Sequence, residues 1–315
     1  MTLHRVTILG ASGFIGRYVV RDLARDGAVI AACGRNAATA GFLRPMGDVG
    51  QIATFSADLG DERALAAVVE GADAVVNLVG ILYESGKQRF DLAHHRGPQK
   101  LAALAKSAGV KRLVHVSALG ADANSRSAYS RSKAEGEAAV RAAFPGATIL
   151  RPSLVFGPED TFFNRFGAMA RFSPVLPLIG GGATKFQPVY VGDVADAVAA
   201  VLSRNDTAGK TYELAGPAVF TLRQLFELIL HVIGRKRLLM SVPFGLASLE
   251  AFFLEWLPNP LLTRDQVRLL RQDSIAAPGM PGLAELGIAP TALELILPTY
   301  LDRFRHPGRF RPSHA

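Results

Sequence analysis

The sequence predicts an α/β protein, with a doubly wound parallel sheet and a smaller, mostly helical C-terminal lobe. Short apolar runs alternate with stretches of helical periodicity, and a glycine-rich turn joins the first run to the first helix. This alternation is typical of parallel sheets, because each parallel strand needs a crossover connection. The expected strands cover 6–9, 28–33, 51–56, 74–79 and 113–116.

Two lobes are expected. The chain begins to cross over at Arg151-Pro152-Ser153, returns as a strand at 186–191, and enters a helix that Asp193 caps. We therefore assign 1–155 and 186–215 to the sheet domain and 156–185 and 216–315 to the smaller lobe.

Composition narrows the classes of function. The 315 residues are 49% hydrophobic and carry a net charge of +8, which favours anionic partners. The single cysteine, Cys33, excludes an internal disulfide and favours a reducing compartment. No segment approaches the roughly 18 apolar residues of a membrane span, and the N-terminus has too little apolar length for a secretory signal. We expect no nucleic-acid binding and assign no metal site.

The glycine-rich turn predicts a dinucleotide site. Gly10 permits the tight turn out of the strand, Gly13 lets the backbone approach a pyrophosphate, and Gly16 lets the helix pack close to the sheet. The N–H groups at the helix start then face the anion. The candidate cofactor-binding residues here are Gly10, Ala11, Ser12, Gly13, Phe14, Ile15 and Gly16.

The end of the second strand predicts NADP(H) rather than NAD(H). An NAD site usually places an acid there, against the ribose 2′-hydroxyl. In this chain Gly34 leaves space and Arg35 brings a guanidinium, which pairs well with a 2′-phosphate.

Later strand ends supply further candidates. Asp58, followed by Leu59, is expected to accept from the adenine amino group or to cap the helix near Asp61. Backbone at Leu78, Val79 and Gly80 is expected to line the cofactor.

A Tyr-x-x-x-Lys pair predicts proton transfer beside the cofactor. Tyr129 and Lys133 share one helix face, and Ser117 follows the fifth strand. A nearby ammonium lowers the pKa of a phenol, and the same lysine can bond the nicotinamide ribose. Tyr129 is the candidate acid/base, Lys133 its partner and Ser117 a hydroxyl donor; the alternative is that Tyr129 and Lys133 only anchor the cofactor.

At this point the sequence resembles the extended or atypical short-chain dehydrogenase/reductase superfamily over residues 5 to 215. The resemblance implies a Rossmann sheet and adds Pro152 to the cofactor-binding candidates. The motifs in order are Gly10-x-x-Gly13-x-x-Gly16, Asp58-Leu59, Asn77-Leu78-Val79-Gly80, Tyr129-x-x-x-Lys133 and Arg151-Pro152-x-x-Val155-Phe156-Gly157-Pro158.

More narrowly, the chain resembles the NADPH-binding accessory subunits of respiratory complex I (NADH:ubiquinone oxidoreductase) and their bacterial relatives. The segments that carry this likeness are 151–166, with Phe162-Phe163-Asn164-Arg165-Phe166; 187–194, with Gln187-Pro188-Val189-Tyr190; and 262–270, with Thr263-Arg264-Asp265-Gln266. The resemblance implies hydrophilic-arm and quinone-module subunits as partners. It also implies a cytoplasmic location, peripheral on the inner face of the cytoplasmic membrane, or on the matrix side if mitochondrial.

Two departures from active members bear on turnover. Active members commonly have Ser-Ser after the fifth strand, and the second serine polarises the substrate carbonyl; this chain has Ser117-Ala118. The asparagine expected three residues before Gly97 is His94. Loss of one oxyanion-type donor costs about 10²–10³ in rate, which fits a site that keeps its nucleotide and turns over little.

The C-terminal third offers contact surfaces. Phe162, Phe163, Phe166 and Phe172 are expected to line a substrate cleft or to pack between the lobes. Residues 244–257, bounded by Pro243 and Pro258, predict an apolar helix of about four turns that lies on a membrane, on a partner or on its own lobe. Arg303, Arg305, Arg309 and Arg311 form a basic tail.

Three hypotheses follow from the sequence. The leading one is a complex I accessory subunit that holds NADP(H) as a structural ligand. The second is an active NADP-dependent reductase, epimerase or dehydratase that acts on a nucleotide-sugar or another carbonyl substrate. The third is a soluble binder that senses the NADPH/NADP⁺ ratio, with residues 244–257 as its contact helix.

Overall fold

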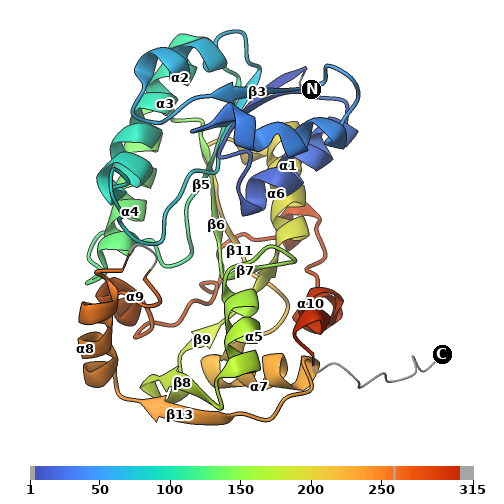
Figure 1. Cartoon of the computed structure of the whole chain (residues 1–315). Coiled ribbons are helices and arrows are strands. Elements are labelled where there is room, and N and C mark those ends of the chain that lie inside the picture. Colours follow the sequence, from blue (N-terminus) through green and yellow to red (C-terminus); the bar gives the residue numbers. More distant parts are fainter. Residues whose placement is uncertain (1–3, 258–259, 306–315) are drawn as a thin grey trace, which may run out of the picture. The chain divides into compact units, whose positions relative to one another are not determined.

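A seven-stranded parallel sheet forms the centre of the first unit in the computed structural model, which describes residues 4–257 and 260–305 (Figure 1). The strand order β11-β6-β5-β4-β1-β2-β3 is that of the doubly wound Rossmann sheet. The predicted fold class is therefore confirmed. The strands are β1 Arg5–Leu9, β2 Val29–Gly34, β3 Ile52–Ser56, β4 Ala74–Asn77, β5 Arg112–Val116, β6 Thr148–Pro152 and β11 Thr211–Leu214.

Helices cover both faces of this sheet. Figure 1 shows α1 (Phe14–Arg25) and α6 (Val191–Ser203) on one face, and α2 (Glu62–Val69), α3 (Gly97–Ser107) and α4 (Ala128–Ala143) on the other. The strands are apolar on both faces because both are covered. Between the sheet and α2, α3 and α4 lies a core that includes Leu9, Cys33, Leu65, Val75, Leu101, Leu113, Val140 and Ile149.

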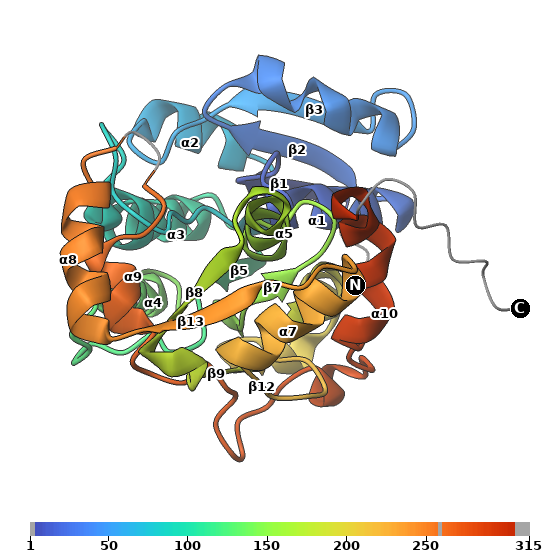
Figure 2. The same cartoon turned by 60° about the horizontal axis from the view of Figure 1, so that its bottom comes forward.

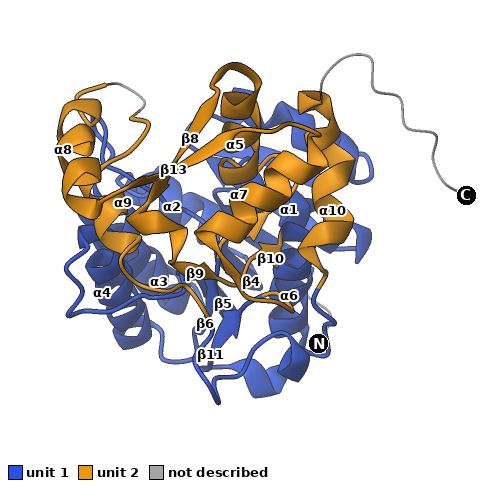
Figure 3. Cartoon of the chain, turned by 90° about the horizontal axis from the view of Figure 1, so that it is seen from below, with its two compact units in different colours: residues 1–153, 191–215, 276–290 blue, residues 154–190, 216–275, 291–315 orange. Residues whose placement is uncertain are grey.

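The chain divides into two compact units (Figure 3). Unit 1 comprises residues 1–153, 191–215 and 276–290, and unit 2 comprises 154–190, 216–275 and 291–315. Residues 276–290, expected in the smaller lobe, thus belong to the sheet unit. They are tied to β11, where the Glu213 N–H donates to the carbonyl of Pro281 at 2.9 Å.

Unit 2 is mostly helical and carries three short strand pairs. Its helices are α5 Phe162–Phe172, α7 Leu222–Val232, α8 Phe244–Leu254, α9 Arg264–Leu269 and α10 Leu293–Leu301. Its strand pairs are β7 (Val155–Phe156) with β10 (Val189–Tyr190), β8 (Val175–Ile179) with β13 (Leu238–Val242), and β9 (Lys185–Phe186) with β12 (Phe220–Thr221). Figure 2 shows α5, α7 and α10 grouped around the core of this unit.

Two local expectations are wrong. Residues 186–191 are not one strand, because Phe186 ends β9 and Val189 begins β10, and the two strands belong to different pairs. Helix α6 already begins at Val191, so Asp193 lies inside its first turn rather than at the cap. An acid there still interacts favourably with the helix dipole.

The phenylalanine cluster has a different role from either one expected. Phe163 is fully buried, while Phe162 and Phe166 pack against Phe226 of α7, so these rings form the core of unit 2. Phe172 is 83% exposed and lies outside that core. The pattern was ambiguous because core and cleft both require apolar side chains at helical spacing.

Helix α8 is shorter than expected and lacks a buried apolar stripe. It ends at Leu254, after about three turns, and its buried residues are Ala247 and Ala251. Trp256, just beyond it, is 81% exposed. Among residues 4–257 and 260–305, no helix is both long and apolar enough to cross a membrane. Pro258, Arg309 and Arg311 lie outside the described residues.

Candidate functional site

The candidate site lies where the parallel strands of unit 1 end. Gly10 follows β1, Arg35 follows β2, Asp58 follows β3, Gly80 follows β4 and Ser117 follows β5. Carboxyl ends of parallel strands share one edge of the sheet, and β1 lies between β2 and β4, where the strand order reverses. Ligands of open α/β sheets bind at this switch point.

The glycine turn is closed too tightly to admit side chains. Gly10 has φ +80°, and a Cβ there would lie 3.1 Å from the carbonyl carbon of Leu78. A Cβ on Gly16 would lie 2.3 Å from the Gly10 carbonyl oxygen, so α1 begins directly against the turn. Gly13 is the N-cap of α1, and no side chain of the described residues caps this helix. These features suit a diphosphate on the helix-start amides.

The β2 end presents Arg35 to solvent. Arg35 is exposed, and the preceding Gly34 keeps the backbone near Ser12, whose Oγ would lie 3.4 Å from a Cβ at that glycine. The arginine is thus placed beside the glycine turn, as a 2′-phosphate contact requires.

Asp58 does not cap the following helix. Asp61 is the N-cap of α2 and accepts from the Ala64 N–H at 3.1 Å, whereas Asp58 accepts from the Gly60 N–H at 2.8 Å. Of the two roles considered for Asp58, the cap is therefore wrong, because the N-cap position lies three residues later, at Asp61. Asp58 is exposed beside the buried Leu59.

Tyr129, Lys133, Ser117 and Gly80 converge where β4 and β5 end. Lys133 Nζ lies 5.9 Å from the centroid of the Tyr129 ring and donates to the Val116 carbonyl oxygen at 3.4 Å. A Cβ on Gly80 would lie 3.3 Å from the same Nζ. A side chain at this position would therefore crowd the Lys133 ammonium. Ser117 is buried one residue beyond Val116.

Burial sets the protonation of this pair. It raises the pKa of Tyr129 to about 12 and lowers the pKa of Lys133 to about 8, an effect that the Glu137 carboxylate opposes. Desolvation of the phenolate therefore shifts the pKa of Tyr129 in the direction opposite to the one expected from a nearby ammonium.

His94 links three parts of the site as a neutral imidazole. Its Nε2 accepts from the Ile81 N–H at 3.1 Å, so the ring proton sits on Nδ1 and is donated to Ser132 Oγ at 2.9 Å. Ser132 in turn donates to the Tyr129 carbonyl at 2.8 Å. Burial, with Lys133 and His115 adding to it, lowers the pKa of His94 to about 2. His94 lies in the π-helical turn Asp91–Arg96, a feature often found at functional sites.

His115 and Ser117 carry buried polar atoms that need partners. The Asn77 Oδ1 accepts from the Val79 N–H, so its Nδ2 donates to His115 Nδ1 at 3.1 Å and leaves the proton on Nε2. Among the described residues, neither His115 Nε2 nor Ser117 Oγ has a partner. Burial lowers the pKa of His115 to about 3. The sequence prediction missed His115, although a polar histidine within the apolar run of β5 was a signal that could have found it.

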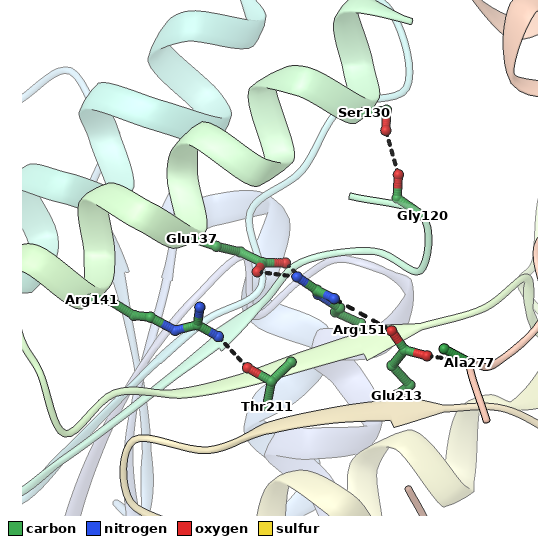
Figure 4. Close-up of polar contacts among 8 residues, drawn as sticks. All are labelled: Gly120, Ser130, Glu137, Arg141, Arg151, Thr211, Glu213 and Ala277. Carbon is green, nitrogen blue, oxygen red and sulfur yellow. Dashed lines mark hydrogen bonds and ion pairs between the residues drawn. The ribbon is translucent and has the colours of Figure 1, made fainter. Parts of the chain in front are cut away.

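Arg151 links two glutamates, Glu137 of α4 and Glu213 of β11 (Figure 4). Its guanidinium donates to both carboxylate oxygens of Glu137 at 2.8 and 2.7 Å and forms an ion pair with Glu213 at 3.4 Å. Glu213 also accepts from the Ala277 N–H at 2.8 Å. Both glutamates are buried, and loss of one partner of such a network costs about 3–5 kcal/mol. Arg151 thus fixes α4, which carries Tyr129 and Lys133.

Pro152 ends β6, and its carbonyl accepts from the Leu119 N–H at 2.9 Å. This bond places the segment after Ser117 next to the β6 end. Taken together, the glycine turn, the helix start without a side-chain cap, the absence of a side chain at Gly80 beside Lys133 and the Ser117 hydroxyl without a partner among the described residues fit a nicotinamide dinucleotide. The phosphates would lie on the turn and the nicotinamide ribose beside Lys133.

Comparisons with known proteins agree with this geometry. Residues 6–215 match the model of the NAD dependent epimerase/dehydratase family. The subunit named "NADH dehydrogenase [ubiquinone] 1 alpha subcomplex subunit 9, mitochondrial" from Arabidopsis thaliana is 38% identical over 96% of this chain and 78% of its own length. A ceramide reductase from Caulobacter vibrioides is 33% identical over 76% of this chain and 73% of its own.

Solved structures show the same fold. The NADPH-dependent quinone oxidoreductase QOR2 from Escherichia coli, complexed with NADPH, superposes with a TM-score of 0.74 at 25% identity, covering 93% of this chain and 98% of that one. The family model spans the glycine turn and the Tyr129–Lys133 pair alike. On these grounds, the chain belongs to the NAD dependent epimerase/dehydratase family.

Proposed function

We propose that this chain is an accessory subunit of respiratory complex I that holds NADP(H) as a structural ligand with little or no turnover. One observation carries the proposal: the likeness to the Arabidopsis complex I subunit covers 96% of the chain, whereas the likeness to the ceramide reductase covers 76%. A nucleotide that binds only the folded state stabilises the fold by mass action, which gives it a role without chemistry.

Arg35 supports NADP(H) as the ligand. It is the exposed cation directly after β2, where an NAD-specific site would carry an acid. The guanidinium pairs with the 2′-phosphate through charge-assisted hydrogen bonds.

Three features of the site support low turnover. Ala118 supplies a methyl group where active relatives carry the carbonyl-polarising hydroxyl. The Tyr129 phenol, with its pKa raised to about 12, is a poor base near neutral pH. Both nitrogens of His94 are engaged in hydrogen bonds, so the imidazole is not free to relay protons. Tyr129 and Lys133 then anchor the nicotinamide end.

Hydrophilic-arm and quinone-module subunits are the proposed partners, with α8 and the residues after it as the contact surface. This surface is apolar and exposed, including Leu249, Phe253 and Trp256. Patches of this kind mark interaction sites. We place the chain on the inner face of the cytoplasmic membrane, or on the matrix side in mitochondria, as a peripheral subunit.

Co-purification tests the proposal. An affinity-tagged chain expressed in its own host is captured from detergent-solubilised membranes and separated by native electrophoresis. We expect co-migration with the quinone-module subunits. Recovery only as a free species would overturn the proposal, provided that a known peripheral subunit is retained in the same preparation.

An active reductase is the second candidate, favoured by the retained Tyr129–Lys133 pair and by the ceramide reductase relative. Single-turnover oxidation of bound NADPH with a panel of carbonyl substrates distinguishes the two. Oxidation that the wild type performs and Tyr129→Phe abolishes would establish the enzyme. Equal, negligible oxidation by both proteins supports the structural role.

A further inference from the structure

A basic groove in unit 2 lies outside the nucleotide site. It encloses about 1260 Å³ between the end of α7, the turn that follows it, the start of β13 and α10. Figure 2 shows α7, β13 and α10 adjacent to one another. The lining includes Arg235, Lys236, Arg237, His231 and Arg305, with Glu227 as its one acid among the described residues.

The cations of the groove exceed the carboxylates near it. Glu227 pairs with Arg223 at 4.0 Å, and Asp302 pairs with Arg305 at 2.9 Å. Within the described part of the chain, Arg235, Lys236 and Arg237 form no ion pair. The charge of Arg237, with that of Arg171 beyond the groove, helps burial to lower the pKa of Arg235. Neighbouring like charges disfavour one another's charged forms, and a bound anion would offset this repulsion.

Hydrogen bonds to backbone carbonyls hold the arginines of the groove in place without using all of their N–H donors. Arg235 Nε donates to the Phe304 carbonyl at 3.1 Å, and Arg305 Nε donates to the Val232 carbonyl at 3.1 Å. Arg237 Nε donates to the Ala170 carbonyl at 2.8 Å. These bonds use only part of each guanidinium, so the remaining N–H groups are positioned for an acceptor.

Capping of α7 does not explain this concentration of charge. Backbone donors already meet two of its C-terminal carbonyls, since the Gly234 N–H donates to the His231 carbonyl and the Arg235 N–H to the Leu230 carbonyl, and of the groove arginines Arg305 alone bonds a third, that of Val232. A cation near a helix C-terminus gains only about 0.3–1 kcal/mol from the helix dipole.

Exposed apolar side chains border the groove. Leu238 follows Arg237 directly and is exposed, and its N–H donates to the Pro174 carbonyl, two residues after the exposed Phe172. The Arg171 guanidinium lies 5.4 Å from the centroid of the Phe172 ring. Fixed cations beside exposed aromatic and aliphatic groups suit a ligand with an anionic head and an apolar tail.

We propose that this groove binds the phosphate headgroup of an anionic phospholipid, with Phe172 and Leu238 contacting the acyl region beside it. The proposal deepens, and rests on, the peripheral membrane location proposed above. An acidic protein segment would satisfy the charges but not the two apolar side chains, and it becomes an outcome of the test.

Flotation with vesicles tests the proposal on the full-length chain. We expect binding to vesicles of phosphatidylglycerol and phosphatidylcholine, no binding to phosphatidylcholine alone, and weaker binding at high salt. Lys236→Gln should lower the partition coefficient about fivefold, the equivalent of one basic charge near an anionic surface. Lys106→Gln, at an exposed lysine of α3 in unit 1, is the matched control and should change nothing.

Several outcomes would overturn the lipid assignment. One is binding that Lys236→Gln and Arg235→Gln leave unchanged. Another is stabilisation by inorganic phosphate without vesicle binding, which would assign the groove to a soluble anion. A third is a pair of results: the wild type does not bind vesicles, and Lys236→Gln no longer co-migrates with complex I. That pair would assign the groove to an acidic protein partner. If the wild type does not bind vesicles and both variants still co-migrate with complex I, the groove proposal is rejected. The proposed function is then unaffected.

Discussion

The carboxyl edge of the sheet in unit 1 and helix α8 in unit 2 differ in what they bury. At the sheet edge, polar side chains such as His94, His115 and Lys133 are buried and mostly bonded. On α8, only two alanines are buried, and most of the large apolar residues are exposed. Buried polar networks position a small ligand, whereas exposed apolar surface requires a macromolecular partner. The comparison separates the proposed nucleotide site from the proposed docking surface within one chain.

Acid should destabilise the protein strongly through the two buried histidines. The folded state holds His94 and His115 neutral, with pKa values of about 2 and about 3, while the unfolded chain protonates them near pH 6.5. The unfolded state therefore binds more protons below pH 6.5, and stability falls as the pH falls. At up to about 1.4 kcal/mol per unit and group, the free energy of unfolding should drop by about 3 kcal/mol from pH 6.5 to 5.

Denaturant titrations at several pH values measure this slope. His94→Asn should remove about half of it, and the exposed control His231→Asn should leave it unchanged. A slope equal in wild type and His94→Asn would show that His94 is not held neutral in the folded protein.

Two helical glycines should respond oppositely to alanine. A Cβ on Gly136 of α4 would lie 1.8 Å from the His94 carbonyl oxygen, so Gly136→Ala should cost about 3 kcal/mol through displaced backbone. A Cβ on Gly245 of α8 meets nothing within 4 Å among the described residues, so Gly245→Ala should be neutral or stabilise by up to about 1 kcal/mol. Equal effects in thermal or denaturant unfolding would contradict the contrast between the two helices.

Replacing an exposed aromatic side chain just after α8 should weaken docking to complex I without affecting the fold. Trp256→Ser should weaken association with complex I by about 2 kcal/mol, as loss of an aromatic anchor does, and leave the melting temperature of the isolated chain unchanged. Leu295→Ser on α10, also exposed, is the control. Normal retention of Trp256→Ser in native electrophoresis would mean that another surface carries the interaction.

Cofactor choice should depend on the charge of Arg35. Arg35→Asp should shift the ratio of NADP(H) to NAD(H) affinity by about 10- to 100-fold, the range of one charged hydrogen bond. Arg63→Asp, at an exposed position of α2, should not shift it. Titration calorimetry with both nucleotides measures the ratio, and an unchanged ratio removes the phosphate role from Arg35.

The sheet and the nucleotide turn could be predicted from the sequence because their signals are local. Apolar runs separated by helical periodicity indicate where strands exist, and the spacing of Gly10, Gly13 and Gly16 between a strand and a helix is typical of a dinucleotide turn. The predicted strands also give the positions where each strand ends. Those ends define the shared sheet edge that carries Arg35, Gly80 and Ser117.

What could not be predicted depends on contacts between distant residues. The pairing of Arg151 with Glu137 and Glu213, the tautomers of His94 and His115, and the raised pKa of Tyr129 all arise from tertiary burial. The core role of Phe162 and Phe163 was likewise hidden, because apolar spacing does not say what covers a helix. The groove at Arg235 is lined by three separate segments of the chain, so no sequence motif marks it.

Nucleotide analysis of the purified complex tests the central claim most directly. Complex I captured through the tagged chain is denatured, and the released nucleotides are quantified by mass spectrometry for wild type and Tyr129→Phe. We predict NADP(H) in equal amount with the tagged chain in both proteins, with an NADPH fraction that incubation with carbonyl substrates leaves unchanged. Complexes without NADP(H), or NADPH consumed in wild type and kept in Tyr129→Phe, would contradict a structural nucleotide.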